Sequence, residues 1–190
     1  PAPYIILGWT HLSDFFRRWS KSPKQSLARV VQLAKEVLAL DDSRWGPHAQ
    51  LGFVYLVRRQ HEKAIAEMER AVALAPSSDR THAFLGRALH YAGRSDEAIP
   101  LLKKALRRNP HPESWMLQYL GEAYVMTGRY DEAIAACKEA IKIAPINKSA
   151  HIVLTSAYAL SGREQEARTQ AGEVLSINPK YCMRSGKGFY

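Results

Sequence analysis

A spacing of 34 or 35 residues recurs along this chain of 190 residues and restricts what it can fold into. Three sets of residues follow it: the pairs Leu51-Gly52, Leu85-Gly86, Leu120-Gly121 and Leu154-Thr155; the alanines Ala64, Ala98, Ala133 and Ala167; and the prolines Pro76, Pro110, Pro145 and Pro179. A fixed period of this length indicates a solenoid, in which each unit buries its apolar face against its neighbours.

Each period reads as two helices. In residues 79–110, Leu85, Gly86 and Leu89 recur at helical spacing and predict one buried stripe. Gly93 supplies the positive φ that ends a helix, and Pro110 stops the second helix because it cannot continue the hydrogen-bond ladder.

At these residues the chain resembles the tetratricopeptide repeat (TPR) family. The resemblance implies an all-α, right-handed superhelical solenoid of five helix-turn-helix units in one domain, residues 1–181, followed by a basic, glycine-containing tail at 182–190. We expect the repeats at residues 1–44, 45–78, 79–113, 114–147 and 148–181.

The first repeat is longer than the others. Leu7-Gly8 precedes Leu51-Gly52 by 44 residues, so ten additional residues lie between its two helices. We expect them in an enlarged turn at residues 14–24, with the second helix running from about Lys24 to Leu40.

Basic charge is concentrated outside the regular repeats. The net charge is +9, and residues 14–29 carry five basic residues against one acidic residue, while the last eleven carry three basic residues and no acid. Interleaved aromatic and basic side chains at Phe15–Trp19 suit three interpretations: a turn that covers the open end of the first repeat, an acidic protein partner, or a nucleic-acid strand or membrane interface. Binding of nucleic acid or an acidic surface through residues 14–29 and the tail is therefore the alternative function.

The cysteines do not form a disulfide framework, because there are only two. Cys137 stands where Met68 and Leu102 stand in sister repeats, which predicts a core position, and Cys182 lies in the tail. No apolar run reaches the length of a membrane span. We expect a cytoplasmic protein.

No pattern of catalytic residues is evident. The sequence lacks a glycine-rich phosphate loop, a His-Glu-x-x-His motif and a nucleophile elbow. His48, His82 and His151 occupy the same place in three repeats, which predicts packing residues and not a metal site. We expect no enzyme activity, no cofactor and no metal.

The resemblance implies that the face of each first helix opposite the core stripe lines a concave groove. The groove residues predicted in this way are Trp9, Phe53, Leu56, Arg87, His90, Tyr91, Glu122 and Met126. Such an apolar groove with a central polar spot suits an amphipathic helix or an extended peptide. We expect Phe53→Ala and Met126→Ala to weaken binding at little cost in stability, and Leu85→Ala to destabilise.

The partner is predicted to be a protein or peptide. Chaperone-binding members of the family hold a C-terminal carboxylate with Lys and Asn one turn apart, but here the pairs read Ile5/Trp9, Ala49/Phe53, Ala83/Arg87 and Gln118/Glu122. The carboxylate clamp is therefore absent.

The first repeat also resembles TPR regions of bacterial signalling proteins, including nucleotidyl-cyclase-type adenylate cyclases, which implies a regulatory part of a longer chain. At the C-terminal end we expect Val174, Leu175 and Ile177 to be partly uncovered, so that the chain self-associates there as a homo-oligomer or the natural protein continues past it.

Overall fold

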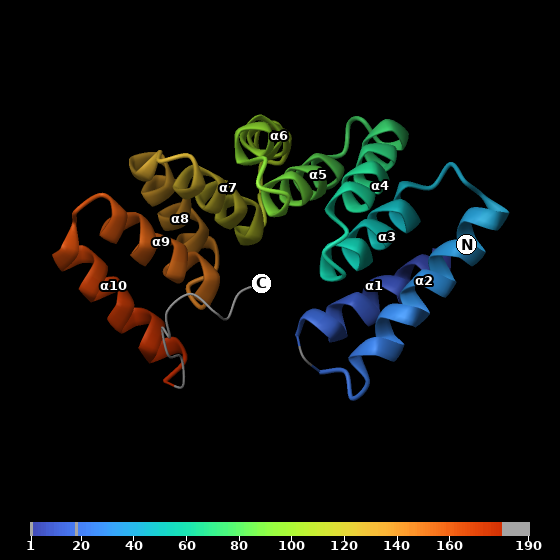
Figure 1. Ribbon diagram of the computed structural model, residues 1–190, viewed down its shortest axis with the longest axis horizontal. Helices are drawn as coiled ribbons and strands as arrows, with labels where there is room; N and C mark the ends of the chain where they lie inside the picture. The colour runs from blue at the N-terminus through green and yellow to red at the C-terminus, as the bar shows by residue number, and fades with distance from the viewer. Residues whose placement is uncertain (1, 18, 180–190) are drawn as a thin grey trace. The chain divides into compact units, whose positions relative to one another are not determined.

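The computed structural model describes residues 2–17 and 19–179, and in these residues it contains ten α-helices and no strand (Figure 1). The all-α prediction is thus confirmed. The chain divides into two compact units, Pro1–Pro110 and His111–Tyr190. Unit 1 contains α1 (Ala2–Phe16), α2 (Pro23–Leu40), α3 (Trp45–Val57), α4 (His61–Leu74), α5 (Asp79–Tyr91) and α6 (Ser95–Arg108). Unit 2 contains α7 (Ser114–Met126), α8 (Tyr130–Ile143), α9 (Lys148–Leu160) and α10 (Glu164–Ile177).

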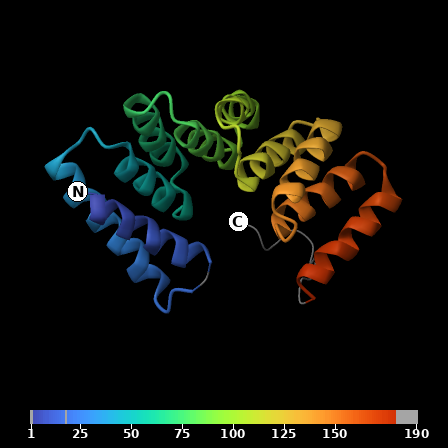
Figure 2. The same ribbon diagram turned by 180° about the vertical axis from the view of Figure 1, so that it is seen from behind.

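Consecutive helices form pairs, and within each unit the pairs stack as in a helical solenoid. In unit 1, α1 packs on α2, α3 on α4 and α5 on α6; in unit 2, α7 packs on α8 and α9 on α10. Seen from behind, each pair again consists of two helices side by side, joined by a short connection (Figure 2). Four of the five predicted pair starts, at Trp45, Asp79, Ser114 and Lys148, are the observed starts, and α1 begins at Ala2.

Three of the turns inside the pairs have a glycine with positive φ: Gly93 at 79°, as predicted, Gly128 at 73° and Gly162 at 77°. The pair α3–α4 makes the same kind of turn with Arg59 at φ 57°, where an arginine adopts the left-handed conformation at some cost in strain. A turn can therefore keep its geometry without its preferred residue.

The additional residues of the first pair are mainly helical, which corrects the expected turn at residues 14–24. Helix α1 continues through Phe15 and Phe16, and α2 begins at Pro23. Only residues 17–22 connect the two helices. Pro23 explains the early start of α2, because a proline at the first helical position has its φ already set and gives up no hydrogen bond there.

The first pair also closes without the proline found at this place in the others. The carboxylate of Asp41 accepts hydrogen bonds from the Ser43 hydroxyl (2.5 Å), the Ser43 backbone N–H (3.1 Å) and Arg44 Nε (2.7 Å). The Ser43 hydroxyl, followed by Arg44, lowers the pKa of Asp41 to about 2. Asp41 therefore stays ionised at neutral pH, and its hydrogen bonds fix the conformation of the residues that follow α2.

Within three of the pairs, a glycine of the first helix faces a bulkier, buried side chain of the second helix. A Cβ added to Gly52 would lie 2.7 Å from Met68 Cε, one on Gly86 2.8 Å from Leu102 Cγ, and one on Gly121 2.5 Å from Cys137 Sγ. Met68, Leu102 and Cys137 are fully buried. Each glycine thus provides the space that its partner's side chain fills, and the predicted core position of Cys137 is confirmed.

Of the three residues of α10 that were expected to be partly uncovered, one is buried. Val174 is buried, whereas Leu175 is exposed and Ile177 is half-buried. Val174 stands in the column of Ala71, Ala105 and Ala140, which faces into the pair, so its predicted exposure is wrong. Cys182 and the rest of the predicted tail lie outside the described residues.

The close contact at Gly86 predicts that Gly86→Ala destabilises the fold. A Cβ there would lie 2.8 Å from Leu102 Cγ and 3.3 Å from the Ala98 carbonyl oxygen, so Leu102 or the helix backbone would have to shift. Such overpacking costs about 1–3 kcal/mol, measured by urea unfolding at equilibrium.

Gly172→Ala is the matched control, because a Cβ at Gly172 in α10 would meet nothing within 4 Å. It should stabilise by about 0.5–1 kcal/mol through helix propensity alone. Equal effects of the two substitutions would show that the packing at Gly86 is not tight.

Candidate functional site

The first helices of unit 1 bring four aromatic rings together. We call Trp9 and Phe16 of α1, Phe53 of α3 and Phe84 of α5 the aromatic cluster. Ring centroids lie 4.8 Å apart for Phe53–Phe84, 5.7 Å for Trp9–Phe53 and for Trp9–Phe84, and 6.2 Å for Phe16–Phe53. Three of these pairs are edge-to-face, the arrangement favoured by the ring quadrupoles.

The first helices of the three pairs in unit 1, which are α1, α3 and α5, meet at this cluster, because α1 packs on α3 and α3 packs on α5. The one-turn extension of α1 matters here, since it places Phe16 beside Phe53. Consequently, Phe53, one of the predicted groove residues, is covered by the chain's own aromatic side chains.

Arg87 of α5 lies against the cluster. Its guanidinium carbon is 5.0 Å from the ring centroid of Phe53, 5.3 Å from Phe16 and 5.7 Å from Tyr91, all within the range of cation–π attraction. The residue is half-buried. A charge held among rings is less screened than one in bulk water, which strengthens its attraction for an anionic group.

His90 and Tyr91 continue the same helix beyond Arg87. The Nδ1 of His90 lies 3.1 Å from the Ser95 hydroxyl, and its ring centroid lies 5.6 Å from that of Tyr91. Tyr91 is 39% exposed and Phe16 is 45% exposed. Arg87 is therefore bordered by two aromatic side chains that solvent can reach.

The eight predicted groove residues are distributed over both units. In unit 1, Trp9, Leu56, Arg87 and His90 are half-buried and Tyr91 is exposed. Phe53, however, is only 3% exposed, so the expectation that it lies outside the core is wrong. Its burial results from Phe84, which the sequence analysis did not single out, together with Trp9 and Phe16.

Glu122 and Met126 belong to α7 in unit 2. Glu122 accepts a hydrogen bond from Gln118 Nε2 at 2.9 Å, and Met126 is 63% exposed. Burial, with a smaller contribution from Glu122, raises the pKa of the Cys137 thiol to about 12, so this cysteine is not a nucleophile at neutral pH. A single groove formed by all eight residues stays a prediction.

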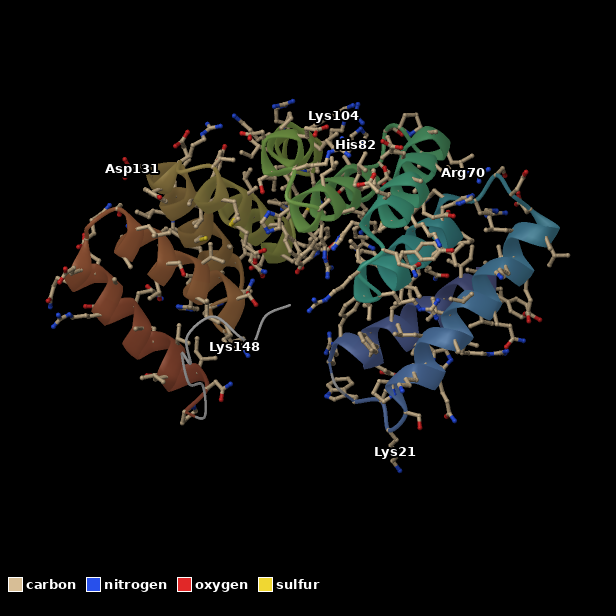
Figure 3. All side chains as sticks on the ribbon, viewed as in Figure 1. Lys21, Arg70, His82, Lys104, Asp131 and Lys148 are labelled. Carbon is tan, nitrogen blue, oxygen red and sulfur yellow. The ribbon has the colours of Figure 1, made fainter. Side chains whose placement is uncertain are left out.

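In the aromatic and basic segment, Phe15–Trp19, the ring centroids of Phe15 and Phe16 lie 5.5 Å apart. The guanidinium carbon of Arg17 lies 4.9 Å from the ring centroid of Trp19, whose side chain is well exposed. Lys21, in the same connection, points away from the helices (Figure 3). Arg18 and the basic tail lie outside the described residues, so the nucleic-acid alternative stays a prediction.

The three histidines that share one place in the repeats are packing residues, as predicted. His48, His82 and His151 are buried on separate helices. His48 lies 2.7 Å from Glu67, and His82 lies 2.8 Å from the Ser78 carbonyl. His151 lies 2.9 Å from the Pro145 carbonyl and also contacts the Gln170 side-chain amide. Within residues 2–17 and 19–179, no group of three or more His, Cys, Asp or Glu side chains is arranged to hold a metal ion.

None of the described helices is both long and apolar enough to cross a membrane.

The burial of Phe53 predicts that Phe53→Ala destabilises the fold strongly. Removing a buried phenylalanine costs about 3–5 kcal/mol. Met126→Ala should change stability by no more than about 0.5 kcal/mol, because Met126 is largely exposed. Denaturant unfolding of the two variants checks this; a small loss for Phe53→Ala would mean that Trp9 and Phe84 do not enclose it.

Comparisons with known proteins agree with this architecture. Three family models described as tetratricopeptide repeat match residues 47–111, 85–148 and 124–181. Among curated proteins, no sequence matches the chain significantly.

Solved structures have the same fold. A crystal structure of MamA is 26% identical, with 84% of this chain and 93% of that chain covered and a TM-score of 0.68. YrrB, described as a TPR protein with an unusual peptide-binding site, is 21% identical, with coverages of 84% and 82% and a TM-score of 0.66. The family matches overlap and together cover four of the five helix pairs; through residues 47–181, the chain therefore belongs to the tetratricopeptide repeat family.

Proposed function

We propose that this chain is a protein-interaction scaffold that binds a peptide segment of its partner on unit 1, with Arg87 as the anchor for an acidic group of that peptide. The observation that carries the proposal is the position of the Arg87 guanidinium among the rings of Phe16, Phe53 and Tyr91.

The family supports the general function. Tetratricopeptide repeats form binding scaffolds, and stacked helical repeats present extended surfaces to their partners. YrrB, which has a similar fold, is described as a TPR protein with an unusual peptide-binding site. The residues described here offer no converging set for catalysis, and the buried Cys137 has a raised pKa, which disfavours nucleophilic chemistry.

The chemistry of the peptide follows from what surrounds Arg87. A guanidinium presents a planar fork of N–H donors that matches a carboxylate. Phe16 and Tyr91 beside it are partly exposed and offer apolar area. We therefore expect Asp, Glu or a C-terminal carboxylate next to an aliphatic or aromatic residue. An amphipathic helix and an extended peptide both satisfy this requirement.

Selection from a phage-displayed peptide library with the full chain as bait tests this chemistry. We expect the recovered peptides to carry an acidic residue beside an apolar one. Arg87→Gln should weaken their binding by about 10- to 100-fold, the range for a lost hydrogen bond to a charged group, as measured by calorimetry.

Arg107→Gln is the matched control, since Arg107 is an exposed arginine at the end of α6 in the same unit. It should leave the affinity unchanged, and circular dichroism should show both variants folded. If both arginine variants weaken binding equally, the attraction is a general effect of positive charge and Arg87 is not the anchor.

The role of the scaffold in a longer signalling protein also remains a proposal. It rests on the resemblance of the first repeat to TPR regions attached to nucleotidyl cyclases, and the comparisons provide no support for that attachment. The sequence of the complete gene product tests it.

A further inference from the structure

The aromatic side chains at the end of α1 and in the connection that follows it have different surroundings. Phe16 belongs to the aromatic cluster, with its ring centroid 6.2 Å from that of Phe53. Trp19, three residues later, is 68% exposed. Packing within the fold therefore accounts for Phe16 but not for Trp19.

Trp19 has a defined place although it is exposed. Its backbone N–H donates to the Asp14 carbonyl at 2.9 Å, which ties it to the end of α1. The hydroxyls of Ser20 and Ser26 lie 2.7 Å apart, which ties the same connection to α2. The guanidinium carbon of Arg17 lies 4.9 Å from the Trp19 ring centroid, within the range of cation–π attraction. The indole is thus presented to solvent by an ordered connection.

The exposure of this connection is a property of its place in the helix pair. The later pairs of unit 1 have another pair packed before them, because α3 packs on α2 and α5 packs on α4. Their equivalent connections are nevertheless exposed, at Arg58, Arg59 and Gln60 in one pair and at Gly93 and Arg94 in the other. In both views of unit 1, the connected ends of α1 and α2 lie on the side away from α6 (Figures 1 and 2). Trp19 therefore lies on a part of the repeat that stays open to solvent.

Positive charge surrounds Trp19 without an acidic residue close in sequence after it. Residues 15–35 contain six basic residues and no Asp or Glu. Arg17, Lys21 and Lys24 are exposed, and Lys21 points away from the helices (Figure 3). We call Arg17, Trp19, Lys21 and Lys24 the basic tip. Clustered charge of one sign attracts a surface of the opposite sign.

The shape of the basic tip favours a flat partner. A single nucleic-acid strand is held in a charged groove that follows its backbone, and small ligands are held in concave sites. The basic tip instead lies on a projecting connection between two helices. A bilayer surface is flat and wide, so an indole and the charged groups around it can reach it together.

The residue types of the basic tip match the chemistry of an anionic bilayer surface. Tryptophan is enriched at the level of the lipid headgroups, because its ring is apolar and its N–H is polar. Lysine and arginine are attracted to anionic headgroups, and the planar guanidinium of arginine matches a phosphate.

We propose that the basic tip is a docking site for the surface of an anionic lipid bilayer. The Trp19 indole enters the headgroup region, and the Arg17 guanidinium beside it binds a lipid phosphate. Lys21 and Lys24 add electrostatic attraction. The argument is charge complementarity combined with an exposed indole, and it does not depend on the peptide site at Arg87.

Flotation of the full chain with lipid vesicles tests the proposal. We expect binding to vesicles of equal parts phosphatidylcholine and phosphatidylglycerol, and binding at least about 10-fold weaker to phosphatidylcholine alone. Trp19→Ala should weaken binding to the anionic vesicles by about 10-fold, because the apolar area of the indole is lost. Lys21→Gln combined with Lys24→Gln should weaken it by about 10- to 30-fold, at about 5-fold for each charge.

Matched controls make the same kinds of change elsewhere. Met126→Ala removes a side chain that is 63% exposed in α7, and Lys103→Gln combined with Arg107→Gln removes two exposed charges from α6. Both should leave vesicle binding within about twofold, because the attraction to headgroups falls off within a Debye length. Arg87→Gln should also leave it unchanged, which separates this proposal from that of the peptide site. Circular dichroism should show every variant folded.

Three results would overturn the proposal. The first is no binding to the anionic vesicles. The second is binding that survives Trp19→Ala, or that falls equally in the tip variants and their controls, which would reduce the attraction to general positive charge. The third is binding of a single-stranded oligonucleotide or of polyglutamate in place of the vesicles, weakened by the same tip variants, which would make a nucleic acid or an acidic protein the occupant.

Discussion

The packing of α3 on α4, α5 on α6 and α7 on α8 depends on matched sizes at one contact inside each of these three helix pairs. Where the second helix carries Met68, Leu102 or Cys137, the first helix carries glycine, and the large side chain fills the space above the glycine backbone. The last pair reverses the sizes, because Thr155 stands in the glycine column and Ala171 in the column of the large residues. Since interiors are packed at close to crystal density, neither partner can change alone.

This contact explains how much of the fold the sequence could predict. Glycine, alanine and proline recur with the period because the backbone geometry requires them, and the helix starts at Trp45, Asp79, Ser114 and Lys148 follow directly. The first pair was harder to predict. Its additional residues could form either a loop or helix, and Pro23 together with the continuation of α1 through Phe16 makes most of them helical.

The candidate site was predicted only in part, for a related reason. Helical periodicity places Arg87 and Tyr91 on the face opposite the core stripe, and both retain some exposure. It cannot show that Trp9 and Phe84 meet over Phe53, because that contact joins three repeats and depends on how α1, α3 and α5 are spaced. Phe53, predicted to line an open groove, is therefore buried, whereas Arg87 and its bordering rings keep some exposure.

Direct binding of an acidic group of a partner peptide by Arg87 is tested most directly by a double-mutant cycle. The affinity of a selected peptide is measured for the original pair, for Arg87→Gln, for the peptide with its acidic residue changed to the amide, and for both changes together. Direct contact predicts a coupling energy of about 1–3 kcal/mol between the two changes. A coupling energy near zero, with each change weakening binding independently, would contradict it.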